Sequence, residues 1–478
     1  MKYLVLFFLL IGFQVCISQE VVLDFKCNQK SKQIKKRTYS LSNSLNNDLA
    51  VLIREKKRVY AYLFDENFNS KREFTFDSSK KKKYNALLGD KISNSKYSLL
   101  YSNSIHNRFC VLTIDFNSKS SNLKEIELAF RNERYLKTVN HQNRLYVLST
   151  TIDNEIIIRE LNDNYEFQII NTQILQLDKK QKLHTKDFRY NGFWSTLKSN
   201  IIKIDNRIPN SIEHASEDNK IYKQDGNLFL TFDNKTESTL MYVISLTDFT
   251  VERKEFAYPT GKLDDFKRHN SYFIDNILFQ IASSNKEITL VAKKLDGSIL
   301  QSYYFDKETP INIKNSTIVQ DGATALPFVT KREFEETSKF LRKISSGKVG
   351  MSGYLKDNSY HFTIGGVKET VRSGPMMMPM YSTTTLSNNV QITMVSYNPV
   401  FSSYNSYSTT KSTFFKTKFD LGFNYIKDNV VNSNIFDQIE EYSDSLKYIS
   451  GEDVFYHKDQ LLFGYFSMKE GQFKLVRF

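Results

Sequence analysis

Short apolar segments recur along the chain, and each one follows a short polar turn. The seven most apolar of them cover residues 49–53, 97–101, 145–149, 228–232, 277–281, 360–364 and 461–466. Their first residues are 48, 48, 83, 49, 83 and 101 positions apart, which indicates a repeat of about 48 residues that insertions lengthen. Apolar runs this short between turns are typical of β-strands that are buried on both faces.

The flanks of each apolar segment repeat as well. The preceding turns are rich in Asn, Asp and Gly, as at residues 46–48, and these residue types accept the left-handed backbone angles of tight hairpins. Further β-rich runs follow each segment, and the last run of the sixth repeat is predicted at 423–430. The seventh repeat stops after 472–478, so we expect residues 21–25 to supply its missing strand.

This pattern resembles a β-propeller. A small sheet with two apolar faces is not stable alone, and stacking such sheets radially buries both faces and leaves short, protected edges. We therefore expect an all-β fold: a β-propeller of seven four-stranded blades, closed by an N-terminal strand, with short helices in the insertions. The resemblance is one of architecture, since the sequence has no Trp-Asp series, kelch double-glycine signature or repeated sialidase-type Asp motif.

Two other folds fit the pattern less well. An outer-membrane barrel agrees with the aromatic content and with the C-terminal Phe478, but strands that cross a bilayer need ~9–11 residues. A pair of β-sandwiches gives no reason for an incomplete last repeat with a matching strand near the N-terminus.

Residues 1–18 are predicted to be a signal peptide, and residues 19–478 form the expected propeller domain. Lys2 precedes an unbroken apolar run, and the small residues Cys16 and Ser18 fit cleavage before residue 19. An uncleaved anchor and a lipoprotein modified at Cys16 are the alternatives. The composition, rich in Lys and Asn and poor in Ala, resembles that of secreted proteins of Gram-negative bacteria. Export to the periplasm or the cell surface is therefore expected.

Four long insertions are predicted, near 171–220, 306–348, 365–410 and 431–450. In an up-and-down sheet all four connections lie at the same end of the strands. Insertions on one face of a repeat scaffold typically mark a binding face, although long surface loops also arise at little energetic cost. Thr330 and Glu333 form a capping box that predicts a helix through residue 344, and the apolar spacing predicts a second helix at 436–446.

Composition narrows the class of protein. The 478 residues are 40% hydrophobic, enough for a large core, and the three Cys exclude a disulfide scaffold or a Cys-rich zinc protein. The formal net charge is +13. For an exported protein this charge favours an anionic polysaccharide, lipid headgroups or an acidic protein as a partner over a nucleic acid.

No catalytic motif is present. The seven His residues lack metal-ligand spacing, and the sequence has no nucleophile elbow, P-loop or EF-hand loop. We therefore predict no catalytic residue, metal or cofactor. Whether the protein is an enzyme stays open, because a catalytic site assembled from distant repeats leaves no motif.

The insertion at 365–410 contains an unusual cluster of Met and aromatic residues. Thioethers provide an adaptable contact surface or soft ligands for Cu(I), and aromatic rings anchor sugars or proteins. For the Met residues the alternative is a mobile loop or a loop that packs its Met side chains onto the scaffold, and for the aromatic residues it is ordinary strand pairing. The predicted partner-binding residues are Met376, Met377, Met378, Met380, Tyr381, Tyr397, Phe401, Tyr404 and Tyr407.

These observations predict an exported binding or scaffold module that recognises a protein or glycan of the cell envelope through loops on one face. Peripheral association with a membrane fits the same charge, and no nucleic-acid partner is expected. The alternative is a hydrolase or lyase with its active site at the mouth of a central channel. Converging carboxylates or His residues with shifted pKa values would favour the alternative.

Overall fold

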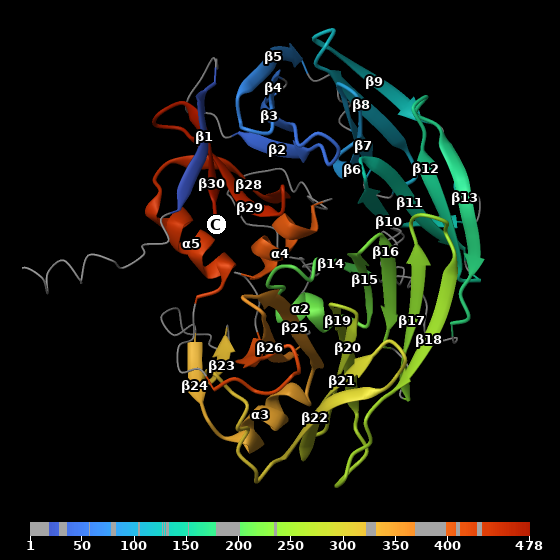
Figure 1. Ribbon diagram of the computed structural model, residues 1–478, viewed down its shortest axis with the longest axis vertical. Helices are drawn as coiled ribbons and strands as arrows, with labels where there is room; N and C mark the ends of the chain where they lie inside the picture. Colours follow the sequence, from blue (N-terminus) through green and yellow to red (C-terminus); the bar gives the residue numbers. More distant parts are fainter. Residues whose placement is uncertain are drawn as a thin grey trace, which may run out of the picture. The chain divides into compact units, whose positions relative to one another are not determined.

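The computed structural model describes residues 19–27, 36–56, 58–77, 83–103, 106–126, 128, 130, 133–151, 153–177, 201–233, 237–321, 331–368, 398–407, 412–427 and 433–478. In these residues the chain forms seven separate sheets, five of four strands and two of five (Figure 1). It divides into two compact units: unit 1 comprises Met1–Ser78 and Gln438–Phe478, and unit 2 comprises Ser79–Asp437.

Unit 1 contains the first and the seventh sheets. The first sheet consists of β2 (Arg37–Ser42), β3 (Leu49–Glu55), β4 (Arg58–Phe64) and β5 (Ser70–Asp77). The seventh consists of β28 (Ile449–His457), β29 (Gln460–Ser467), β30 (Gln472–Arg477) and β1 (Glu20–Lys26).

The N-terminal strand completes the seventh sheet. Strand β1 pairs antiparallel with β30, with Val21 opposite Val476 and Phe25 opposite Phe473. The expectation that residues 21–25 supply the missing strand is therefore confirmed. Apolar side chains of both sheets of unit 1 form one cluster, and the first strands of the two sheets are adjacent.

Unit 2 contains the other five sheets, in chain order. The second sheet consists of β6 (Ala86–Ser93), β7 (Lys96–Ser102), β8 (Phe109–Asp115) and β9 (Ser120–Ile126). The third consists of β10 (Glu133–His141), β11 (Arg144–Thr151), β12 (Glu155–Leu161) and β13 (Phe167–Ile174). The fourth consists of β14 (Ile202–Ile204), β15 (Asn219–Gln224), β16 (Asn227–Phe232), β17 (Ser238–Ser245) and β18 (Val251–Ala257).

The fifth sheet consists of β19 (Arg268–Ile274), β20 (Ile277–Ser283), β21 (Glu287–Lys294) and β22 (Ile299–Asp306). The sixth has the order β24 (Lys331–Phe334), β23 (Ile318–Asp321), β27 (Ser412–Phe419), β26 (Ser359–Val367) and β25 (Lys348–Lys356). Within the described residues four helices lie between strands: α2 (Ile212–Ala215), α3 (Thr337–Ile344), α4 (Pro399–Tyr407) and α5 (Ile435–Ser445).

Burial changes in a regular way across each sheet. The second and third strands of a sheet are almost fully buried, as in β3 and β4, which agrees with the apolar runs of the sequence. The fourth strands, such as β5, β9 and β13, are largely exposed. In unit 2, β6 touches β10 and β19 touches β25. We call β6, β10, β14, β15, β19 and β25 the inner strands of their sheets.

The polar turns have the predicted backbone conformation. At least one residue with positive φ occurs in each of the seven turns between first and second strands, from Asn47 to Asp459. Asn and Asp tolerate this conformation because their short side chains hydrogen-bond to the nearby backbone. The seven sheets, their polar hairpins and the N-terminal strand in the last sheet together have the pattern of a seven-bladed β-propeller.

The sixth sheet departs from the expected pattern. The run predicted at 423–430 forms no strand over its described residues, and only Tyr425 makes an isolated bridge, with Phe419. Strand β23, from the preceding insertion, occupies the edge of β27 instead. The Asn315 side chain accepts a hydrogen bond from the backbone N of Lys418 at 2.7 Å, so this part of the edge is already occupied.

The predicted helices are partly correct. Helix α5 confirms the prediction for 436–446. The capping-box prediction at Thr330 and Glu333 is wrong, because Glu333 lies in β24 opposite Val319, and α3 begins only at Thr337. Helix α4 was not predicted. No helix within the described residues is long and apolar enough to cross a bilayer.

Candidate functional site

The residues predicted to contact a partner fall into two groups. Met376, Met377, Met378, Met380, Tyr381 and Tyr397 lie outside the described residues. Phe401, Tyr404 and Tyr407 lie together in helix α4 rather than in a loop. The signal peptide predicted at 1–18 also lies outside the described residues.

Helix α4 is fixed to unit 2 by apolar and polar contacts. Val400 and Ser403 are buried, and the Ser403 hydroxyl donates a hydrogen bond of 2.6 Å to Oδ1 of Asn210. The Tyr404 ring lies 5.5 Å from the Phe436 ring in an edge-on arrangement. Part of the aromatic signal in this segment therefore reflects packing, and the role of Phe401, Tyr404 and Tyr407 in binding stays a prediction.

Asn210 holds the segment between β14 and α2 in place. Its Nδ2 donates to the carbonyl oxygens of Asp205 and Ile208, at 2.7 and 3.0 Å, and to the Tyr272 hydroxyl at 3.2 Å. Its backbone N donates to Oγ of Ser352 at 3.1 Å. The segment is thus tied to the inner strands of the fifth and sixth sheets.

Helix α2 continues this arrangement. The Ser211 side chain caps it by accepting a hydrogen bond from the backbone N of His214, and the helix contacts β14, β25, β26 and α4. On β25, a Cβ at Gly350 would lie only 2.8 Å from Cα of Ser216. A glycine at this position lets the backbone after α2 lie directly on the sheet.

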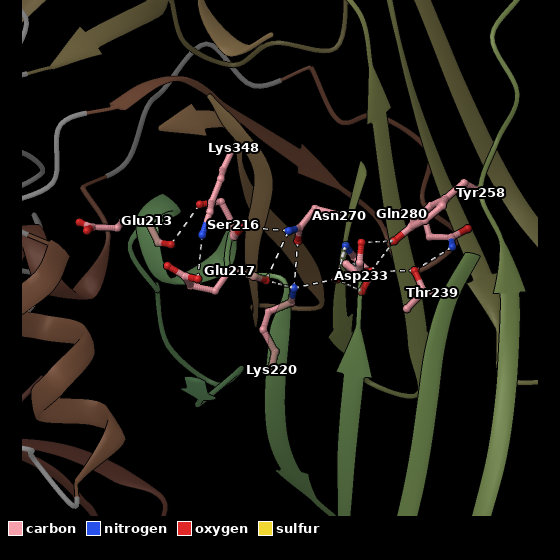
Figure 2. A network of polar contacts seen from close by, with 11 residues as sticks. Glu213, Ser216, Glu217, Lys220, Asp233, Thr239, Tyr258, Asn270, Gln280 and Lys348 are labelled. Carbon is pink, nitrogen blue, oxygen red and sulfur yellow. Dashed lines mark hydrogen bonds and ion pairs between the residues drawn. The ribbon is translucent and has the colours of Figure 1, made fainter. Parts of the chain in front are cut away.

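A buried ion pair connects the fourth and fifth sheets (Figure 2). Nζ of Lys220 lies 2.8 Å from Oδ2 of Asp233, and both side chains are 0% exposed. Lys220 also donates to the carbonyl oxygen of Glu217 at 2.5 Å and to Oδ1 of Asn270, on β19, at 3.0 Å. All three donors of the ammonium group therefore have an acceptor.

The Asp233 carboxylate has equally complete partners. Its Oδ2 accepts hydrogen bonds from the backbone N and the hydroxyl of Ser271, at 3.1 and 2.8 Å. Its Oδ1 accepts from the hydroxyls of Thr239 and Tyr258, at 2.8 and 2.7 Å. Burial, with Asp233 beside it, raises the pKa of Tyr258 well above its usual value, so this phenol remains a donor. Because no part of the pair is exposed, we interpret it as a structural link.

A second set of charged groups lies on the inner strands of the second, third and fourth sheets. We call Asp90, Lys137, Asn140, Lys203 and Lys223 the inner-strand cluster. Nδ2 of Asn140, on β10, donates to Oδ1 of Asp90, on β6, at 3.1 Å. Nζ of Lys223, on β15, donates to the carbonyl oxygen of Asn140 at 2.7 Å. These contacts connect three successive sheets of unit 2.

Two lysines of the cluster share one face of the fourth sheet. Strands β14 and β15 are parallel, with Lys203 beside Ile221, so Lys203 and Lys223 both point to the side of Ile221. Nζ of Lys203 donates to the carbonyl oxygen of Thr138, on β10, at 3.4 Å. Lys203 is half-buried and Lys223 is exposed. The cluster is therefore accessible to solvent, unlike the pair of Lys220 and Asp233.

The surroundings shift the pKa values of this cluster. Burial raises the pKa of Asp90 to about 6, against the effect of Lys203 and Lys223. Burial lowers the pKa of Lys203 to about 8, and repulsion from Lys223 and Lys137 adds to this. Although the Lys223 side chain reaches solvent, the surrounding protein removes part of its hydration, and this and Arg207 lower its pKa. A carboxyl group and an amine with pKa values near neutrality thus lie in one accessible cluster.

Sequence reasoning did not identify this cluster. The five residues are scattered charged or polar positions on four strands, and none forms a motif. The one local signal is position: Asp90, Asn140 and Lys223 all lie within four residues of the polar turn that ends their strand. Within the described residues no group of three or more His, Cys, Asp or Glu side chains could hold a metal ion.

Comparison with known proteins gives only distant likenesses. No family model and no curated protein matches the chain. Among solved structures, an oligogalacturonate lyase in complex with manganese matches with a TM-score of 0.32 and 8% identity, over 94% of this chain and 97% of that one. The dihydro-heme d1 dehydrogenase NirN matches with a TM-score of 0.27 and 9% identity, over 57% of this chain and 48% of that one. The SapL1 lectin, in complex with α-methyl fucoside, matches with a TM-score of 0.22 and 7% identity, over 70% of this chain and 90% of that one.

Proposed function

We propose that this protein is an exported binding module that recognises a glycan or a protein of the cell envelope, in the periplasm or at the cell surface. The observation that carries the proposal is the contact between two insertions. The Ser403 hydroxyl and Asn210, 193 residues apart in sequence, form a buried hydrogen bond, and helices α2 and α4 touch. Both insertions are held on the inner strands of unit 2.

Such an arrangement favours recognition over a scaffold role alone. Loops fixed on a rigid sheet lose little conformational entropy when they bind a ligand. We call residues 368–398, between β26 and α4, the predicted recognition segment. The chain enters this segment from β26, which ends at Val367, and leaves it into α4, which begins at Pro399. Both attachment points therefore belong to well-packed elements of unit 2. The net charge of +13 favours an acidic partner, and peripheral association with an anionic membrane is compatible with it.

The test removes the predicted recognition segment without disturbing its anchors. Residues 372–396 are replaced by a short Gly-Ser linker, which leaves α4 in place, and binding to purified envelope polysaccharides and envelope proteins is measured by surface capture. We expect wild-type thermal stability and a loss of binding of about tenfold or more. The matched control replaces residues 322–330 with the same type of linker and should bind as wild type. Full binding by the 372–396 variant would overturn the proposal.

A second candidate is a hydrolase or lyase, and the shifted pKa values of the inner-strand cluster favour it. A carboxyl group with a pKa near 6 and an amine with a pKa near 8 are suited to proton transfer at neutral pH. The test incubates the protein with acidic and neutral polysaccharides and measures new reducing ends and unsaturated products. Asp90→Asn and Lys203→Met should abolish product formation. The absence of any product from the wild-type protein would exclude this candidate.

A further inference from the structure

We propose that the inner-strand cluster binds an oxyanion, the carboxylate or phosphate group of an acidic ligand. The site lies on β6, β10, β14 and β15 of unit 2 and does not include the predicted recognition segment. The proposal therefore goes beyond recognition through that segment, and it stands or fails separately from it.

The first argument is the hydrogen bonding of the two lysines. In the part of the chain that the structure describes, Nζ of Lys203 and Nζ of Lys223 each donate to a backbone carbonyl oxygen and form no ion pair with a carboxylate. An ammonium group has three donors, so each lysine retains donors for a further acceptor. Lys220, on the same strand as Lys223, shows the opposite case, because all of its donors are used internally.

The second argument is the balance of charge around Lys203 and Lys223. The neighbouring cations are Lys137 and Arg207, and the neighbouring carboxylates are Asp90 and Asp205. Asp205 is already held by Arg207, whose Nε and Nη2 donate to its two oxygens at 2.9 and 2.7 Å. Four cations thus face two carboxylates, and an anion between the lysines would relieve their repulsion.

The third argument is the partial burial of Lys203. A partly buried lysine loses hydration, so it gains more from an anionic acceptor than a fully exposed lysine does. Asn140 fixes Asp90 at one side of the cluster through its Nδ2. When ionised, Asp90 would repel an anion, and when protonated it would offer a further donor.

This arrangement gives the site a definite pH dependence. Lys203, with a pKa of about 8, gains charge as the pH falls through that value, and Asp90, with a pKa of about 6, loses its negative charge at still lower pH. Both changes strengthen anion binding. Two His residues also lie nearby: the pKa of His141 is lowered by burial and by Lys223, and that of His214 is lowered by burial to about 4. Both therefore stay largely neutral near pH 7.

The experiment measures binding by isothermal titration calorimetry at low ionic strength, with glucuronate and inorganic phosphate as probes and glucose as the neutral control. We expect one or both anions to bind and glucose not to bind. Tighter binding of glucuronate assigns the site to carboxylates, and tighter binding of phosphate assigns it to phosphate groups. The double variant Lys203→Met/Lys223→Met should lose about tenfold or more in affinity. If neither anion binds the wild-type protein, or if the double variant binds normally, the proposal is wrong.

A matched control tests whether the position of a lysine, and not its charge alone, determines anion binding. Lys124 also donates to a backbone carbonyl oxygen, that of Asn164 at 2.7 Å, but it is exposed on the outer strand β9. Lys124→Met should bind as wild type, and an equal loss in this variant would overturn the proposal.

A second measurement uses only the wild-type protein, so it stands even if the double variant fails to fold. Near pH 8, anion binding should raise the pKa of Lys203 and take up a fraction of a proton. Titrations in two buffers with different ionisation enthalpies measure this uptake, and zero uptake would contradict the role of Lys203.

Discussion

The buried pair of Lys220 and Asp233 allows a quantitative test of how unit 2 is held together. The change is Lys220→Met, which puts an unbranched apolar side chain, one atom shorter, in place of the lysine and removes its charge. In the variant, Asp233 would keep four hydrogen bonds, from Ser271, Thr239 and Tyr258, but would lose the ion pair with Lys220. A buried carboxylate without a counter-charge is unfavourable because burial removes its hydration.

The expected cost follows from the burial of the pair. Removing one partner of a buried ion pair typically costs about 3–5 kcal/mol, since the remaining charge is uncompensated. The four remaining hydrogen bonds stabilise Asp233 and favour a cost at the lower end of this range. The loss of the hydrogen bonds from Lys220 to Glu217 and Asn270 raises the cost. We therefore expect a loss of about 3 kcal/mol in the free energy of unfolding of unit 2.

Urea unfolding followed by far-ultraviolet circular dichroism measures the effect at neutral pH. The matched control is Lys254→Met, because Lys254, on the outer strand β18, forms an ion pair with Glu252 in which the two side chains are 21% and 63% exposed. Pairs of this kind contribute about 0–1 kcal/mol. The double variant Lys220→Met/Asp233→Asn should recover part of the loss, since it removes the uncompensated charge. A Lys220→Met variant as stable as Lys254→Met would refute this view of the pair.

Three further predictions concern other parts of the fold. Burial lowers the pKa of His457 to about 4, so below pH 6.5 the unfolded chain binds more protons than the folded protein does. The free energy of unfolding should therefore fall by up to about 3 kcal/mol as the pH drops toward 4. Urea unfolding measured at several pH values should show a smaller loss in His457→Asn. Deleting β1 exposes the edge of β30, and hydrogen exchange in β30 should then become much faster than in β3, which keeps both neighbours. Gly350→Ala places a methyl group against the backbone of Ser216 and should lower the free energy of unfolding by about 1–3 kcal/mol. Thermal unfolding measures this loss, and an unchanged stability would show that α2 moves away at no cost.

The repeat could be predicted from the sequence because its signals are local. An apolar run of five or six residues and a polar turn fix a strand and its hairpin almost independently of the rest of the chain. The positive φ angles at Asn47, Asn94 and Asn143, for example, occur in the predicted turns. The pairing of β1 with β30 was predictable for another reason, since an incomplete last repeat requires a strand from elsewhere.

The sixth sheet shows where local signals fail. The segment after Asp420 begins as a hairpin, because the backbone N of Phe423 donates to the Asp420 carbonyl oxygen and that of Ile426 donates to Lys418. Asn315 and strand β23 nevertheless occupy other parts of the same edge of β27, and both belong to an insertion about 100 residues earlier in the chain. Competition between two segments for one strand edge depends on tertiary structure, so no window of the sequence predicts which one pairs.

The inner-strand cluster was unpredictable for the same kind of reason. Asp90, Asn140 and Lys223 come from three sheets, and their contacts depend on how far each inner strand is shifted along its neighbour. The repeat predicts that inner strands are adjacent but not which residues face each other. Helix α4 shows the reverse case. The aromatic residues Phe401 and Tyr404 stand out in the sequence, but the helix that contains them was not predicted.

Three lysines of the same protein show how position decides what a charge does. Lys124, on an outer strand, is exposed, so solvent screens its charge and it contributes little to stability or to selectivity. Lys220 lies fully inside and has a carboxylate partner, so it links two sheets. Lys203 lies between these cases, because it has lost part of its hydration and donates to a backbone carbonyl oxygen and not to a carboxylate. Such a lysine gains the most from an external anion, and this is why we expect binding at the inner strands and not at the exposed lysines of the outer ones.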